Sequence, residues 1–284
     1  MSMVEVDGIE THYEVMGDGP ALLMYSPGGF DARAEQWTNL GIYQRLKLLD
    51  YLPQNYRCIL FDRRENGKSG GRVEQITWGH FVRQGVGLLD VLHIEKAHVI
   101  GGCMGCCPAS AFGVTHPERT LSIVHYWPVG GARYRITCHN RFLEHLKFVR
   151  EQGLQGVVKL VCGHDKNFSA DPRGGPWSQS IRQSDSFAKA YGELKQAEYL
   201  DIVTSMYLGL FDRDTAPGAA PEDLLMLDIP SLIVPGNDNA HATSAARYLH
   251  ECLSNSQYWD IPVAAQTEDN APARILDFLD SVTH

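Results

Sequence analysis

The sequence has little positive charge, no long apolar run and no compact disulfide pattern. Its 284 residues include 25 lysines and arginines against 34 aspartates and glutamates, a formal net charge of −9, which argues against nucleic acid or an anionic membrane as partner. No uninterrupted apolar run approaches membrane-spanning length, and residues 1–5 lack the basic start of a signal peptide. Seven cysteines without a small-domain framework suit a reducing compartment. We therefore expect a cytoplasmic protein that binds a small molecule; whether it forms a homodimer stays open.

The sequence also predicts neither a metal site nor a cofactor. Cys103, Cys106 and Cys107 lie close together in the chain, but no second Cys-x-x-Cys pair and no paired histidines accompany them. The pair Cys103 and Cys106 forms one Cys-x-x-Cys after an apolar run, as in thioredoxin-like redox sites. A dedicated oxidoreductase is the weaker alternative, because the chain is far longer than such a domain.

Short apolar runs alternate with amphipathic stretches along the chain, which predicts a mostly parallel sheet flanked by helices. The expected strands, of which the first two form a hairpin, are residues 3–6, 10–15, 21–25, 57–61, 97–100, 121–127, 231–234 and 257–261. The expected core helices are residues 40–52, 78–92, 106–114 and 273–282.

The most informative segment is Gly101-Gly102-Cys103-Met104-Gly105, between an apolar strand and a helix. A residue in such a tight turn has strained dihedrals, so its neighbours two positions away must be nearly free of side chain. Cys103 would lie at the N-terminus of the next helix, where the dipole and the free N–H groups favour a thiolate. Cys103 is therefore the candidate nucleophile, and the alternative is a small residue tolerated in an inactive protein.

This segment resembles the G-x-S-x-G nucleophile elbow of the α/β-hydrolase fold, with cysteine in place of serine. Residues 62–69 resemble the D-x-R-G-x-G-x-S turn of that family, with Glu65 in place of its first glycine, and residues 116–119 resemble its H-P-E-R. Residues 26–30 occupy the place of its oxyanion loop. The resemblance implies that the backbone N–H groups of Gly29, Phe30 and Met104 form the oxyanion hole.

The resemblance also implies the architecture, an α/β fold whose mostly parallel eight-stranded sheet carries a helical cap inserted after strand 6. We expect the core to comprise residues 1–127 and 217–284, and the cap residues 128–216. The cap contains helix-like stretches at 141–152 and 186–199 around a glycine- and proline-rich loop. Its aromatic side chains predict an apolar or aromatic substrate: Phe168, Trp177, Tyr207 and Phe211.

The acid and the base of the family pattern are displaced. The family acid would fall at Asn239, one residue after Asp238, and residues 261–272, where the family histidine usually lies, contain none. His241 lies on the same loop as Asp238, at the edge of the sheet where sites gather, so we predict a relocated pair facing Cys103. The alternatives are that His241 merely begins a helix, or that His125 is the base. The insertion adds His139, His145 and His164.

Two function hypotheses follow from these residues. The first is an enzyme, a hydrolase or acyl transferase, in which Cys103 attacks the carbonyl of an ester, lactone or thioester. A thiol needs a general base less than a hydroxyl does. The second is a non-hydrolytic member of the same fold, such as a lyase, a cofactor-free enzyme or a ligand-binding protein. Dienelactone hydrolases and polyhydroxyalkanoate synthases have a similar cysteine elbow, and that similarity covers only Cys103 and its glycines.

Overall fold

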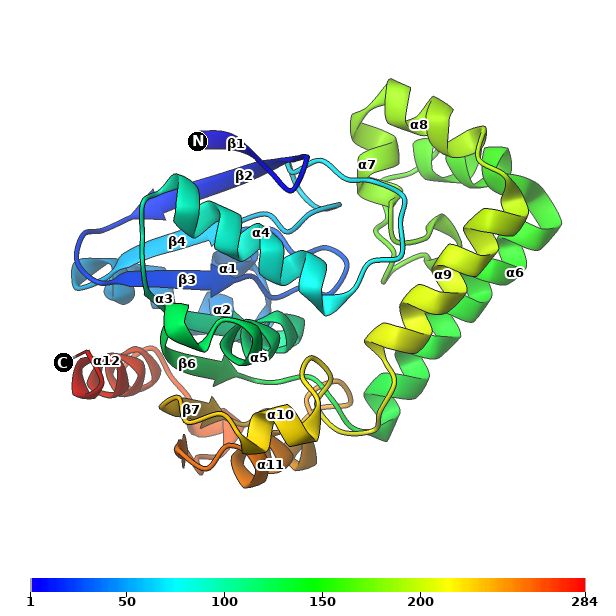
Figure 1. Ribbon diagram of the computed structural model, residues 1–284. Helices are drawn as coiled ribbons and strands as arrows, with labels where there is room; N and C mark the ends of the chain where they lie inside the picture. The colour runs from blue at the N-terminus through cyan, green and yellow to red at the C-terminus, as the bar shows by residue number, and fades with distance from the viewer. Residues whose placement is uncertain (1, 284) are drawn as a thin grey trace.

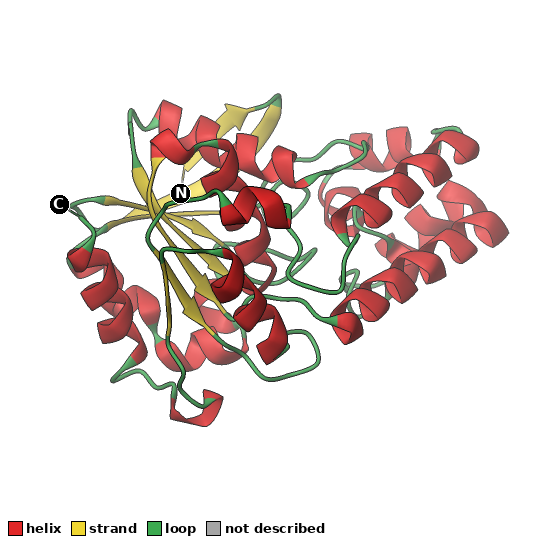
Figure 2. Ribbon diagram, turned by 60° about the horizontal axis from the view of Figure 1, so that its bottom comes forward, coloured by secondary structure: helices red, strands yellow, loops and turns green. Residues whose placement is uncertain are grey.

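The computed structural model describes residues 2–283, in which eight strands form one sheet with helices on both faces (Figures 1 and 2). The strand order is β1-β2-β4-β3-β5-β6-β7-β8. β1 pairs with β2 and β2 with β4 in antiparallel fashion, and all the other neighbours are parallel. The bounds are β1 Ser2–Val6, β2 Ile9–Met16, β3 Ala21–Tyr25, β4 Arg57–Phe61, β5 Ala97–Gly102, β6 Thr120–Tyr126, β7 Ser231–Val234 and β8 Ser256–Tyr258. The predicted eight-stranded, mostly parallel sheet is confirmed.

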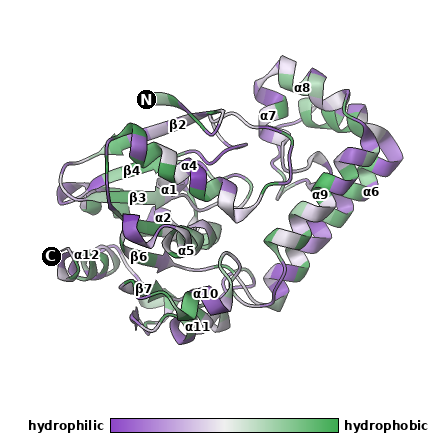
Figure 3. Ribbon diagram, viewed as in Figure 1, coloured by the Kyte–Doolittle hydropathy of each residue, from purple (hydrophilic) through white to green (hydrophobic). Residues whose placement is uncertain are grey.

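Each buried strand contributes side chains to two cores, because successive residues point to opposite faces. In β3, Leu23 and Tyr25 belong to the core under one helical layer, whereas Leu22 and Met24 belong to the other. The first layer contains α4 (Trp78–Val91), α5 (Cys106–Thr115) and α11 (Thr243–Cys252). The second contains α1 (Gln36–Asn39), α2 (Gly41–Leu46), α3 (Leu48–Tyr51) and α12 (Ala271–Ser281). Figure 3 shows the hydrophobic colouring concentrated on the central strands.

Four helices between β6 and β7 lie beyond one end of the sheet (Figure 1). They are α6 (Ala132–Cys162), α7 (Ser178–Gln183), α8 (Asp185–Gly192) and α9 (Gln196–Leu210), and α6 and α9 pack along each other. Gly153, with φ of +67°, kinks α6. α10 (Pro221–Leu225) follows and packs on α5 and α11 of the core. The helical insertion therefore lies where the sequence predicts it, while its division from the core at 127/128 and 216/217 stays a prediction.

Three elements differ from the sequence-based expectation. Residues 40–52 form α2, α3 and a 3₁₀ turn rather than one helix, because Lys47 takes a left-handed conformation with φ of +51°. Residues 186–199 are two helices, since α8 ends at Gly192 and α9 begins at Gln196. The last strand ends at Tyr258 rather than at residue 261. The 3₁₀ helices are η1 Leu52–Gln54, η2 Cys103–Gly105, η3 Pro117–Arg119, η4 Pro172–Gly174 and η5 Val263–Ala265.

Across residues 2–283, no helix is both long enough and apolar enough to cross a lipid bilayer.

Candidate active site

Cys103 lies in a sharp turn between β5 and α5. Its φ is +54°, in the left-handed region that residues other than glycine seldom adopt. The turn continues as the 3₁₀ helix η2 and then as α5, so the thiol lies at the N-terminal end of a helical segment. The side chain is half-buried. A non-glycine residue held in this conformation at the end of a central strand is typical of a functional site.

Gly101 and Gly105, the two outer glycines of the elbow, lie so close to neighbouring backbone atoms that no side chain fits at either position. A Cβ on Gly101 would lie 2.4 Å from the carbonyl oxygen of Gly105, and a Cβ on Gly105 would lie 2.2 Å from the carbonyl oxygen of Tyr25. The Tyr25 carbonyl belongs to the buried strand β3, and the Gly105 carbonyl belongs to the turn itself, so neither can move without disturbing the elbow. The spacing seen in the sequence is therefore a steric requirement of the turn.

His241 and Asp238 come from one loop, between β7 and α11. The Asp238 carboxylate accepts hydrogen bonds from the backbone N–H of His241 at 2.9 Å and from Nδ1 of its ring at 2.9 Å. The backbone N–H of Ala240 also donates to it, at 2.8 Å. A Cβ on Gly236 would lie 2.5 Å from the His241 Cβ, so the glycine leaves room for the histidine. The carboxylate thus fixes both the position and the tautomer of the ring.

The second ring nitrogen of His241, Nε2, is buried and has no well-aligned hydrogen-bond acceptor. Apart from Asp238, the titratable group with which the ring interacts is the Cys103 thiol. Burial raises the pKa of that thiol, but the contact with His241, its positive charge and the amides of Gly28 and Met104 outweigh burial and lower the pKa below its usual value. Burial lowers the pKa of His241, but Cys103 and Asp238 together raise it to about 9. Both shifts favour a thiolate–imidazolium pair over the neutral thiol and imidazole.

We expect Cys103 to react faster with iodoacetamide at pH 7 than the other six cysteines, because its thiolate is stabilised. Burial raises the pKa of Cys58 to about 12 and that of Cys138 to about 11. Cys162 is exposed and serves as an internal reference. Mass-spectrometric mapping at limiting reagent measures the order in which the cysteines are labelled. When the mapping is repeated over a range of pH, the alkylation rate of Cys103 should rise with a midpoint below that of an ordinary thiol. Labelling of Cys162 first, with Cys103 inert, would contradict the expectation.

The loop after β3 supplies amide groups beside the thiol. Gly28 and Gly29 have positive φ values of 116° and 63°, and a Cβ on Gly28 would lie 2.5 Å from the carbonyl oxygen of Asp31. The amides that interact with the thiol are those of Gly28 and Met104. Gly29 and Phe30, the predicted donors, line the same cavity. Gly28 is an additional candidate that the sequence pattern did not indicate, and the oxyanion role of all four amides stays a prediction.

A cavity of about 150 Å³ lies over the elbow, between the core and the cap. It is lined by Cys103, Met104, Gly28, Gly29, Phe30 and Ala240 from the core side and by Tyr134, Cys138, Arg141, Phe142, Phe168, Ser169 and Phe211 from the insertion. Arg141 is the only basic side chain among these lining residues. Phe168 and Phe211 line it as predicted, whereas Trp177 and Tyr207 do not. A second hollow, of about 200 Å³ beside His12 and Asp62, is lined by none of the predicted catalytic residues.

The chain matches the family model described as the alpha/beta hydrolase fold over residues 22–148. Its structure superposes on the enol-lactonase from Burkholderia xenovorans LB400 with a TM-score of 0.61 at 18% identity, covering 98% of this chain and 100% of that one. The match includes the elbow strand, the elbow and the loop after β3.

The chain has the α/β-hydrolase fold.

The named relatives of this α/β-hydrolase-fold protein include hydrolases. The chain is 35% identical over 120 residues to a 2-hydroxy-6-oxononadienedioate/2-hydroxy-6-oxononatrienedioate hydrolase of Comamonas testosteroni, a match that covers 42% of this chain and 40% of the relative. It is 23% identical over 228 residues to 3-oxoadipate enol-lactonase 1 of Acinetobacter baylyi, covering 79% of this chain and 77% of the relative. The chain spans about two fifths of the length of the first of these curated relatives.

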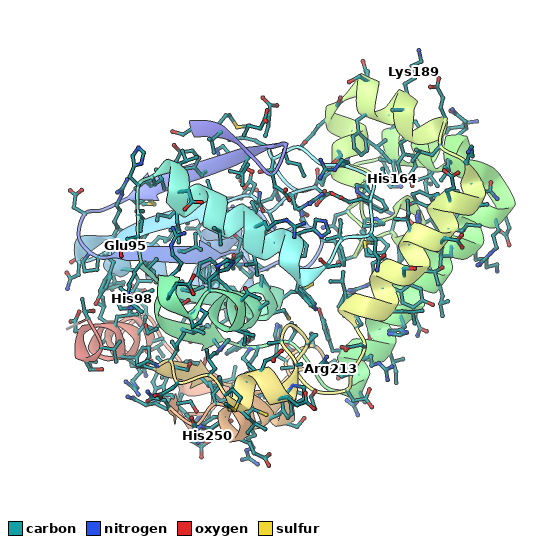
Figure 4. The ribbon with its side chains drawn as sticks, in the orientation of Figure 1. Glu95, His98, His164, Lys189, Arg213 and His250 are labelled. Carbon is teal, nitrogen blue, oxygen red and sulfur yellow. The ribbon has the colours of Figure 1, made fainter. Side chains whose placement is uncertain are left out.

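The other candidate histidines of this α/β-hydrolase-fold protein have partners of their own or are buried, and like His241 they do not line the cavity. His125 is fully buried in β6, burial lowers its pKa to about 4, and it does not line the cavity. His145 is bonded to the carbonyl oxygen of Arg173 and to the hydroxyl of Tyr199. His139 contacts the carbonyl oxygen of Phe211. Figure 4 shows His164 within the helical insertion. His241 is thus the histidine that the structure brings to Cys103.

Gln266 lies within the segment that carries the histidine in the family pattern. Its side chain is fully buried, and its Oε1 accepts hydrogen bonds from the Tyr126 hydroxyl at 2.9 Å and from Nε1 of Trp127 at 2.8 Å. Its Nε2 donates to the carbonyl oxygen of Pro235 at 2.9 Å. The Trp127 ring in turn packs against His241, with 5.3 Å between centroids. Gln266 therefore joins the ends of β6 and β7 and holds the Trp127 ring that packs against His241.

The remaining cysteines near the elbow are poor candidates for redox or metal chemistry. The Cys106 thiol is buried and donates to the carbonyl oxygen of Gly101 at 3.0 Å, and burial raises its pKa well above the usual value. Burial has the same effect on the pKa of Cys107. Within residues 2–283, no group of three or more histidine, cysteine or acidic side chains is placed to hold a metal ion.

Proposed function

We propose that the protein is a hydrolase that acts on a small carbonyl compound through a covalent acyl–Cys103 intermediate. The observation that carries the proposal is the position of His241, whose Nδ1 is held by Asp238 and whose ring interacts with the thiol of Cys103 in a strained elbow. The non-hydrolytic alternative rests on the absence of a histidine from residues 261–272, where the family pattern has one. His241, which comes from the loop after β7, supports the hydrolytic alternative instead.

In the acylation step, the Cys103 thiolate attacks the carbonyl carbon, and a C–S bond forms as the carbonyl π electrons move onto oxygen. The backbone amides of Met104 and of the loop after β3 would stabilise that oxyanion. Its collapse breaks the bond to the leaving group. The imidazolium of His241 donates its Nε2 proton to the departing oxygen or sulfur, which yields a thioester and a neutral imidazole.

In the deacylation step, neutral His241 removes a proton from a water molecule that attacks the thioester carbonyl. The second tetrahedral intermediate collapses with cleavage of the C–S bond. The thiolate leaves without a proton, so the thiolate–imidazolium pair is restored and one water molecule has been consumed. Asp238 keeps the ring oriented throughout and stabilises its charged form.

The cavity favours an unsaturated or aromatic substrate that carries a negative charge. Phe30, Phe142 and Phe168 form an edge-to-face cluster with centroid separations of 4.9 to 5.5 Å, which suits a planar apolar group. Arg141 adds one cation to this wall. A guanidinium forms strong paired hydrogen bonds with a carboxylate, and the dienedioate and oxoadipate in the names of the relatives agree with such a substrate.

The test is hydrolysis of two activated esters of similar size, one neutral and one with a terminal carboxylate. We expect kcat/KM to be at least about tenfold higher for the anionic ester, since a hydrogen bond to a charged group contributes about 1.5–3 kcal/mol. Arg141→Gln should remove that preference, mainly through KM, whereas Arg150→Gln, an exposed arginine of the same helix outside the cavity, should not. Absence of turnover of any activated ester, lactone or thioester would overturn the proposed function.

A further inference from the structure

Arg63, the residue after Asp62 at the end of β4, is a fully buried cation without a carboxylate partner. One guanidinium nitrogen, Nη2, donates to the carbonyl oxygen of Gly29. The guanidinium lies over the Phe81 ring, 5.1 Å from its centroid. The two other nitrogens, Nε and Nη1, are buried and have no hydrogen-bond partner. No ion pair involves Arg63 in the part of the chain that the structure describes, whereas the adjacent Arg64 pairs with Glu65 and Glu74.

An unpaired buried charge is costly unless an anion balances it. Burial lowers the pKa of Arg63 to about 10, so the guanidinium remains charged at neutral pH. The acidic side chains whose charge it would feel are Cys107, Cys103, Tyr134 and Tyr25. Burial raises the pKa values of Cys107, Tyr134 and Tyr25 far above neutral, so these three groups stay uncharged. The Cys103 thiolate is the one anion that this set offers.

The hydrogen bond to Gly29 places the same cation on the oxyanion loop. The Gly29 carbonyl belongs to the peptide unit whose N–H is that of Phe30, a predicted oxyanion donor. A donor on the carbonyl oxygen polarises the peptide, and its N–H becomes a stronger donor in turn. The bond also fixes a loop that contains two consecutive glycines with positive φ. Arg63 is therefore placed to act on the site by two routes, through space on a negative charge at Cys103 and through one peptide on the predicted oxyanion hole.

We propose that Arg63 is a positioning residue of the active site, which holds the oxyanion loop at the Gly29 carbonyl and offsets the negative charge that forms on Cys103 and on the substrate oxygen. The inference rests on the proposed function, because the negative charge that Arg63 would balance is present only if Cys103 reacts as a thiolate. Arg63 differs in this from its two neighbours in the chain. Asp62 accepts hydrogen bonds from backbone N–H groups, and Arg64 pairs with a carboxylate.

The experiment compares Arg63→Met, which keeps the volume but removes the charge, with Arg63→Lys, which keeps the charge. The readout is the pH dependence of Cys103 alkylation, followed by mass spectrometry in the full chain. We expect the midpoint to rise by about one pH unit in Arg63→Met and to return most of the way in Arg63→Lys. In Arg63→Met, kcat for a neutral activated ester should fall about tenfold with little change in KM, a fraction of the loss seen when an oxyanion donor is removed outright.

Phe81→Leu is the matched control, because it alters packing around the guanidinium without removing its charge, and its alkylation midpoint should stay in place. An unchanged midpoint in Arg63→Met, with Cys103 still acid-shifted, would overturn this inference and leave the proposed function standing. An ordinary Cys103 midpoint in the unaltered protein would overturn the proposed function itself. If Arg63→Met and the second neutral variant, Arg63→Gln, both fail to fold, Arg63 serves folding rather than the site, and the inference is wrong.

Discussion

Replacing Cys103 by alanine should abolish turnover of an activated ester, with a fall in kcat of about 10⁴-fold or more. Alanine keeps the elbow geometry nearly unchanged, since it removes only the sulfur, so binding should survive and the loss should appear in kcat. Cys103→Ser should also be severely impaired. A hydroxyl is not ionised by a nearby imidazolium, and it requires a stronger base than a thiol does. The measurement is the steady-state rate of hydrolysis of one activated ester by the unaltered protein, by Cys103→Ala and by Cys103→Ser.

Cys162→Ala is the control for this comparison, because that cysteine is exposed at the end of α6, away from the cavity. It should leave the rate unchanged. Full turnover by Cys103→Ala would contradict the assignment of the nucleophile, and it would favour a lyase, a cofactor-free enzyme or a ligand-binding protein that uses the oxyanion pocket alone.

Replacing His241 by alanine should slow acyl transfer by about 100-fold or more, the usual size of a general-base contribution. The loss should be largest in deacylation, because water needs the base whereas the thiolate does not. Asp238→Asn should cost less, about tenfold, since the carboxylate is 52% exposed and solvent screens its charge. The pH dependence of the rate should also change in Asp238→Asn. His241 loses its charged partner in this variant, so the pKa of His241 should fall from about 9 and the alkaline limb of the rate profile should move to lower pH.

Single-turnover kinetics separate the alternatives for the base. If His241→Ala leaves the rate unchanged while Cys103→Ala abolishes it, the thiolate works unaided or with His125, and the predicted pair is wrong. If neither substitution matters, the protein is not a nucleophilic hydrolase. Asn239→Ala is the matched control, because Asn239 occupies the usual acid position of the family but its side chain bonds to Arg133 on the surface.

The elbow and the central strands could be predicted because their signals are local. A strained turn requires glycines two residues before and after its centre, and the clashes of 2.4 and 2.2 Å at Gly101 and Gly105 are the cause of that spacing. The strands at 21–25, 57–61 and 231–234 agree with β3, β4 and β7 because they are uninterrupted apolar runs between turn residues. The pair Asp238 and His241 was also within reach, since both residues lie on one short loop.

The remaining features depend on contacts that a single sequence does not encode. Gln266 joins Tyr126, Trp127 and Pro235, which are 31 to 140 residues away along the chain. Arg141 was predicted only as part of a helix, and its place on the cavity wall depends on how the helical insertion is positioned beyond the end of the sheet. The helices of the insertion differ most from the prediction: the helix expected over 141–152 is part of the longer α6, Ala132–Cys162, and the helix expected over 186–199 is interrupted between Gly192 and Gln196.

The most direct test of the central claim is a rapidly quenched reaction with an activated thioester, analysed by intact-protein mass spectrometry. In the His241→Ala variant, where deacylation should be slow, we expect one acyl group per chain and a fragment spectrum that places it on Cys103. A chain that turns the substrate over with no mass increment at Cys103, or with the increment on another residue, would contradict the account.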